Sequence, residues 1–204
     1  MPLLPTDLAL TEALLLIATS GIASFMTAVV GIGGGMLMLA VMAQVVPAAA
    51  LIPAHGIVQL GSNGNRAFMT RQHIDWSLLK LFLMGSLVGA ILASFLVVQL
   101  PIAIIELCVG LFILALTWGP KPKGHRLSVT GFSLLGFITT LITMFVGATG
   151  PLVAAAIHHN KTDKLEALAT FSACMSSQNL LKVMVFSFVG FQFAQWMPLL
   201  LLMV

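Results

Sequence analysis

The chain has 204 residues, of which 59% are hydrophobic and 7% charged, and its formal net charge is +3. Soluble domains average about 25% charged residues, so this composition excludes a water-soluble globular protein. The small excess of Lys and Arg gives information on membrane orientation and does not indicate nucleic-acid binding. Mean hydropathy is +1.09, and several apolar runs reach the length of about 18 residues that is typical of membrane-spanning helices. The alternating segments of a transmembrane β-barrel are absent. We therefore predict an all-α polytopic membrane protein with one membrane domain over residues 1–204.

Nine apolar segments follow one another along the chain. They fall at about 9–30, 35–46, 53–69, 77–99, 101–118, 128–147, 150–157, 165–187 and 195–204, with a basic loop at 119–127. Two of them are too short to span the bilayer. At 1.5 Å per residue, 35–46 reaches about 18 Å and 150–157 about 12 Å, against a hydrocarbon core of about 30 Å. The tryptophans Trp76, Trp118 and Trp196 lie at predicted span ends, as interfacial anchors do.

A glycine cluster, Gly31-Ile32-Gly33-Gly34-Gly35, interrupts the apolar stretch near the N-terminus. Glycine costs about 1 kcal/mol in a helix interior, so the cluster predicts a break followed by a new helix. The first N–H groups of that helix would be unpaired at the positive end of its dipole, where anions bind. Gly147-Ala148-Thr149-Gly150-Pro151 repeats the arrangement. Two such helix starts near the bilayer midplane would form an anion cradle. The alternative is close helix packing, which glycine also permits.

Two of the predicted helices carry polar stripes. In the helix 53–69, His55, Gln59, Asn63 and Arg66 are four, four and three residues apart and share one face. The helix 165–187 has a similar density of polar groups. Because such groups are costly against lipid, both stripes should face the protein interior or water. The residues that we predict to bind substrate are Gly33, Gly34, Gly35, His55, Gln59, Asn63, Thr149, Gly150, Thr170, Asn179 and Lys182.

Other roles for these polar side chains stay open. Arg66 lies close to a helix end, from which its side chain can extend to the membrane interface. Asn63 and Asn179 fit either a pore lining or interhelical hydrogen bonds. His55 fits substrate binding, proton relay or a buried structural role. Cys174 fits contact with a sulfur-containing substrate or inert filling of the interior.

Motifs for catalysis and metal binding are missing. Cys108 and Cys174 do not form a spaced pair, so neither a disulfide nor a zinc site is expected. His158 and His159 are adjacent and point apart on a helix, which argues against a metal site with the acidic residues that follow. No Walker A, HExxH or nucleophile-elbow motif occurs. We therefore expect no enzyme activity, catalytic residue, metal or cofactor.

An internal repeat appears when the chain is laid on itself at an offset of about 116 residues. The residues that then coincide are Thr27 with Thr143, Val30 with Val146, Gly31 with Gly147, Gly34 with Gly150, Asn63 with Asn179, and Arg66 with Lys182. Weak symmetry with interrupted helices at matching places is typical of transporter cores. Repeat 1 would cover about 9–118 and repeat 2, which is incomplete, about 128–204. The repeat predicts that about one and a half helices are missing after Val204.

Lys and Arg in short loops predict the orientation. The loops near 66–73, 121–126 and 161–164 are basic. If the short segments count as crossings, each repeat crosses five times, the repeats are inverted, and all three loops lie inside with the N-terminus outside. If the short segments are re-entrant, the repeats run parallel and Lys161 and Lys164 lie outside. The charge bias favours the first arrangement.

Several of these motifs resemble the TauE/SafE family of sulfite and organosulfonate exporters. They are Gly31–Gly35 with the apolar run Met36–Met42, Asn65-Arg66, Ile74-Asp75-Trp76, Gly147–Pro151, Ala169-Thr170 and Asn179-Leu180-Leu181-Lys182. The resemblance covers the chain from about residue 12 to its end. It implies a plasma-membrane carrier of a prokaryote, built as two related halves, that moves small and often sulfur-containing anions without ATP.

The residues and the resemblance together predict a secondary transporter of a small sulfur-containing anion, such as sulfite or a sulfonate, that works by alternating access. Its partners would be the anion and the lipid bilayer. Coupling to protons or other ions and formation of a homo-oligomer stay open. The alternatives are a passive anion channel and a non-transporting membrane scaffold or fragment that needs a partner subunit.

Overall fold

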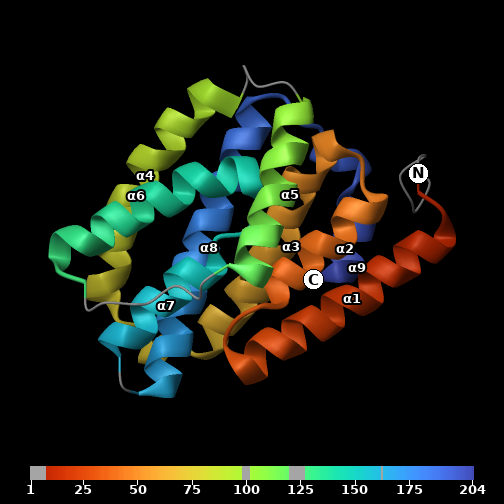
Figure 1. The fold of residues 1–204 in the computed structure, drawn as a ribbon. Coiled ribbons are helices and arrows are strands. Elements are labelled where there is room, and N and C mark those ends of the chain that lie inside the picture. Colours follow the sequence, from red (N-terminus) through yellow and green to blue (C-terminus); the bar gives the residue numbers. More distant parts are fainter. Residues whose placement is uncertain (1–7, 98–101, 120–126, 162) are drawn as a thin grey trace.

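Figure 1 shows the fold as a computed structural model, which describes residues 8–97, 102–119, 127–161 and 163–204. Within these ranges the chain is helical and no strand occurs, in agreement with the prediction. The elements are α1 (Leu10–Val30), α2 (Gly34–Val45), α3 (Ala48–Met69), η1 (Arg71–His73), α4 (Trp76–Val97), α5 (Ile102–Trp118), α6 (Val129–Val146), α7 (Gly150–Asn160), α8 (Lys164–Phe188), η2 (Phe193–Gln195) and α9 (Met197–Met203).

The helices follow the predicted segments closely. α2 has 12 residues and α7 has 11, so both segments predicted to be too short to span the bilayer form short helices. α3 begins earlier than predicted, at Ala48, and carries Pro53 inside it. The proline is tolerated in the second turn because it removes only one backbone hydrogen bond near the helix end. Most of the predicted basic loop at 119–127 lies outside the described residues.

Among the described residues, three helices are long and apolar enough to cross a membrane, namely α1, α4 and α6, with mean hydropathies of 2.1, 2.0 and 1.9. α3 and α8 have 22 and 25 residues but carry the two polar stripes. These two helices pack along each other in the middle of the bundle (Figure 1). Asn63, Gln178, Asn179 and Lys182 are all buried. The polar stripes therefore lie inside the protein, where hydrogen bonds satisfy most of their polar groups.

α4 and α6 lie side by side and approach so closely that glycine is required between them (Figure 1). A Cβ atom on Gly85 would come 1.7 Å from the Ser133 carbonyl oxygen, and one on Gly136 would come 2.1 Å from that of Phe82. Small residues at such crossings let two membrane helices gain van der Waals contact along their backbones.

Both predicted glycine breaks are present, and they share one local geometry. α1 ends at Gly31, whose φ is 87° and whose N–H donates to the Thr27 carbonyl at 2.9 Å. α6 ends at Gly147, whose φ is 88° and whose N–H donates to the Thr143 carbonyl at 2.9 Å. Such φ values are strained for other residues, so the glycines are needed at these helix ends. The internal repeat itself stays a prediction.

Candidate functional site

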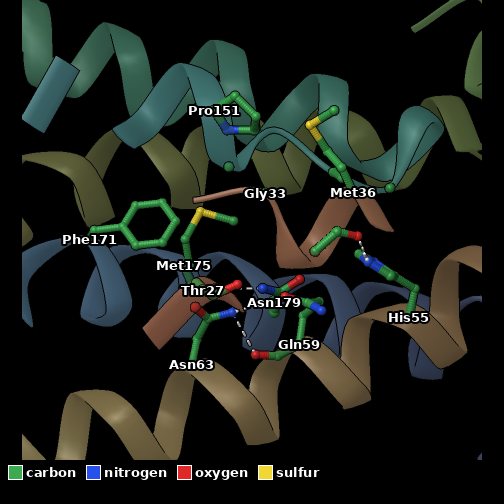
Figure 2. Close-up of a pocket in the computed structure, with 14 residues that line it drawn as sticks. Thr27, Gly33, Met36, His55, Gln59, Asn63, Pro151, Phe171, Met175 and Asn179 are labelled. Carbon is green, nitrogen blue, oxygen red and sulfur yellow. Dashed lines mark hydrogen bonds between the residues drawn. The ribbon is translucent and has the colours of Figure 1, made fainter. Parts of the chain in front are cut away.

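A small cavity lies where the two glycine breaks meet α3 and α8 (Figure 2). Its volume is about 30 Å³, which is room for about two water molecules. Side chains and backbone from distant parts of the chain surround it. The residues predicted to bind substrate that line it are Gly33, Gly35, His55, Gln59, Asn63, Gly150 and Asn179.

The glycines of the break before α2 have different surroundings. A Cβ atom on Gly34 would come 1.9 Å from the carbonyl oxygen of Ala23, so Gly34 is where α1 and α2 pack most closely. Close packing, the alternative to anion binding, therefore accounts for Gly34. Gly35 faces the cavity instead, and a Cβ atom there would come 3.0 Å from the side-chain oxygen of Gln59.

Three other predicted residues, Thr149, Thr170 and Lys182, do not line the cavity. Thr149 is buried and donates its hydroxyl hydrogen to Oε1 of Gln178 at 2.9 Å. The hydroxyl oxygen of Thr170 accepts a hydrogen bond from the backbone N–H of Asp75 at 3.0 Å, at the start of α4. Both hydroxyls therefore join structural elements around the site.

Several lining residues were not among the predicted site residues, namely Thr27, Met36, Gly147, Ala148, Pro151, Phe171 and Met175. Phe171 and Met175 form the apolar wall in Figure 2. They precede Asn179 by eight and four residues, so helical periodicity alone places all three on one face of α8. That signal was present in the sequence. No comparable signal marks Met36, whose position depends on how α2 packs.

Each site asparagine is oriented by a cation one turn further along its helix. Nδ2 of Asn63 donates to the Gln59 carbonyl at 2.9 Å, and Oδ1 accepts from Arg66 at 3.0 Å. In the same way, Nδ2 of Asn179 donates to the Met175 carbonyl at 2.8 Å, and Oδ1 accepts from Nζ of Lys182 at 3.2 Å. A cation at the amide oxygen polarises the amide and strengthens its N–H groups as donors.

The site carries buried positive charge. Lys182 is 0% exposed and donates to the Gly147 carbonyl at 2.7 Å, and Arg66 is 9% exposed and points toward Asn63 instead of the membrane interface. Among the described residues, no carboxylate forms an ion pair with either cation; the ion pairs found there join Lys161 to Asp75 and Glu166. Buried charges are normally paired, so this region favours an anion.

An ionic cluster joins two loops at one end of the bundle. Nζ of Lys161, just after α7, is 2.6 Å from both Asp75 and Glu166. Partial burial acts to raise the pKa of Asp75, but hydrogen bonds from Lys161 and from backbone N–H groups of α4 outweigh it and lower this pKa. The hydrogen bonds to Asp75 and Glu166 raise the pKa of Lys161. Asp75 and Lys161 therefore stay charged at neutral pH, and their ion pair holds the loop at 70–75 beside Lys161 at the end of α7.

A polar, positively charged site enclosed by apolar helices is typical of a membrane transport protein. The chain matches the sulfite exporter TauE/SafE family over residues 16–204. It therefore belongs to this family of membrane transporters, as its motifs predicted. No curated protein and no solved structure matches the chain.

Proposed function

We propose that this protein is a secondary transporter that moves a small sulfur-containing anion, sulfite or a sulfonate, across the plasma membrane of a prokaryote. The observation that carries the proposal is the cavity between the two glycine breaks, which is lined by amide donors and flanked by two buried cations that have no carboxylate partner among the described residues. Family membership supports the same class of substrate.

The anion would bind through hydrogen bonds from both halves of the chain. Backbone N–H groups at the starts of α2 and α7 supply the positive ends of two helix dipoles. Gln59, Asn63 and Asn179 supply side-chain donors on the opposite wall. Gly34, Thr149 and Thr170 support these elements without contacting the anion, and Lys182 contributes its charge from behind Asn179.

The volume of the cavity limits the size of the anion that can bind in it. A volume of about 30 Å³ suits a compact oxyanion better than a bulky organic one. A sulfonate with an organic tail would need the apolar wall at Phe171 and Met175 to move. Alternating access would then consist of one half rocking against the other around a site that both halves build.

The arrangement with five crossings in each half is the one that we propose, with the N-terminus outside. The contact between Lys161 and Asp75 supports it, because these two residues must then lie on one side of the membrane. We expect Gln72→Cys and Lys164→Cys, in a chain with Cys108 and Cys174 replaced by Ala, to react with an impermeant maleimide only from the cytoplasmic side. Gln192→Cys should react only from the other side. Labelling of the first two from opposite sides would contradict the arrangement.

Counterflow of labelled sulfite in proteoliposomes tests the transport proposal. A carrier loaded with unlabelled sulfite takes up label transiently against its gradient, and the uptake saturates. A channel gives no counterflow and saturates only at high concentration. If well-folded protein shows no counterflow of sulfite, thiosulfate or taurine, the carrier proposal is wrong.

A further inference from the structure

His55 lines the cavity, and one of its two ring nitrogens has no hydrogen-bond partner among the described residues. It lies on α3, is 1% exposed, and its Nε2 is 2.9 Å from the carbonyl oxygen of Gly35 (Figure 2). Its Nδ1 is buried and has no hydrogen-bond partner among the described residues. A buried polar atom without a partner is costly, so a ligand that satisfies it binds more tightly.

The bond to Gly35 fixes the protonation of one ring nitrogen. A backbone carbonyl only accepts hydrogen bonds, so Nε2 must carry a hydrogen. In the neutral ring Nδ1 is then a bare acceptor, and in the charged ring it is a donor. A fully deprotonated anion would be repelled by the bare acceptor. Nδ1 therefore bonds to an anion only when one additional proton is present, either on the ring or on the anion.

We propose that the cavity binds its anion together with one proton, held between Nδ1 of His55 and an oxygen of the anion. This inference rests on the proposed function and names the coupling ion of the same site. The proton adds to the Nδ1 lone pair, or stays on the anion and bonds to that lone pair. On the other side of the membrane the anion and the proton leave together, so no other bond forms or breaks.

The charges around His55 couple the two binding events. Lys182 of α8 lies against α3 next to His55, because a Cβ atom on Gly56 would come 3.1 Å from Cδ of Lys182. Neither α2 nor the break at 147–150 carries a titratable side chain. Lys182 opposes a second positive charge on His55 while the cavity is empty, and a bound anion offsets that repulsion. Anion binding therefore favours proton binding, and by linkage the proton favours the anion.

The test measures sulfite uptake driven by a pH gradient in proteoliposomes, with the membrane potential clamped at zero and a pH indicator in the medium. One proton carried with each anion predicts about tenfold accumulation for a gradient of one pH unit. His55→Gln keeps an amide N–H for the Gly35 carbonyl but has no titratable nitrogen. We expect this variant to lose accumulation driven by the pH gradient, and any counterflow that remains in it should proceed without proton movement. His159→Gln, at an exposed position at the end of α7, should behave as the wild type.

Methanesulfonate, which carries no titratable oxygen near neutral pH, is the second probe. Proton uptake with methanesulfonate would place the proton on the ring, and proton uptake with sulfite alone would place it on the anion.

Counterflow of sulfite by the wild type without proton movement would overturn this inference and leave the proposed function intact. Accumulation by His55→Gln equal to that of the wild type would also overturn it. Absence of counterflow in the wild type would overturn the proposed function instead. The wild-type proton measurement decides the question even if His55→Gln does not fold.

Discussion

Lys182→Met is expected to weaken anion binding about thirtyfold while leaving the protein as stable as before. At an effective dielectric constant of about 20 a direct ion pair contributes about 4 kcal/mol, and an indirect one about half of that, about 2 kcal/mol or thirtyfold in affinity. Loss of Lys182 also removes the hydrogen bond to Oδ1 of Asn179, so only the bond from Nδ2 to the Met175 carbonyl still holds the amide. Met fills a similar volume without burying a charge, so the free energy of unfolding without anion should stay the same or rise.

Thermal unfolding with and without sulfite measures both effects. Sulfite at about 100 times the wild-type Kd should stabilise the wild type by about 2.7 kcal/mol and Lys182→Met by only about 0.9 kcal/mol at the same concentration. Lys164→Met, at an exposed lysine on the same helix, is the matched control and should respond to sulfite as the wild type does. If Lys182→Met is strongly destabilised and binds sulfite as tightly as the wild type, the lysine has a structural role only.

Gly34→Ala is expected to prevent α1 and α2 from packing. The added Cβ atom would come 1.9 Å from the Ala23 carbonyl oxygen and 2.2 Å from the hydroxyl oxygen of Thr27. Because one of these atoms belongs to the backbone, the helices must move apart. We expect a loss of about 3 kcal/mol or more in the free energy of unfolding, at the upper end of overpacking effects. Gly21→Ala on α1, with no atom within 4 Å of its Cβ, should cost nothing.

Gly150→Ala separates the packing role of glycine from its role at the cavity. The nearest atoms to its Cβ, in Phe171 and Met175, are 3.7 and 4.0 Å away, so the fold should tolerate the methyl group. That methyl group enters a cavity of about 30 Å³. Sulfite affinity should therefore fall about tenfold or more while the unfolding temperature changes little. Unchanged counterflow in Gly150→Ala would show that the anion does not approach the start of α7.

The helices and both breaks were predictable because they depend on local signals. Apolar runs report the length of a helix, and clustered glycines report where it stops. The polar stripe of Gln59, Asn63 and Arg66 was predictable from its helical spacing. In the structure, hydrogen bonds join these three side chains. The start of α3 was predicted wrongly, since Pro53 is a local signal for a helix start that the surrounding helix overrides.

Some predicted site residues line the cavity and others do not, and helix packing decides which of them do. Periodicity placed Asn63 and Asn179 correctly on the faces of α3 and α8 that line the cavity. It did not separate Gly34 from Gly35, which are neighbours with opposite surroundings, one against the α1 backbone and one at the cavity. Thr170 shares a helix with Asn179 but bonds to Asp75 at the end of the bundle.

The sequence by itself determined the class of this protein, its helices, its two breaks and its family, because each of these depends on residues close together along the chain or on a pattern of motifs. Only the tertiary structure decided which polar groups face one another. Three contacts of this kind join different helices or loops: the hydrogen bond of His55 to Gly35, the hydrogen bond of Lys182 to the Gly147 carbonyl, and the ion pair of Lys161 with Asp75. These contacts depend on how the helices cross. Close backbone contacts, such as those at Gly85 and Gly136, set the crossing of the helices, and no local sequence pattern specifies such contacts.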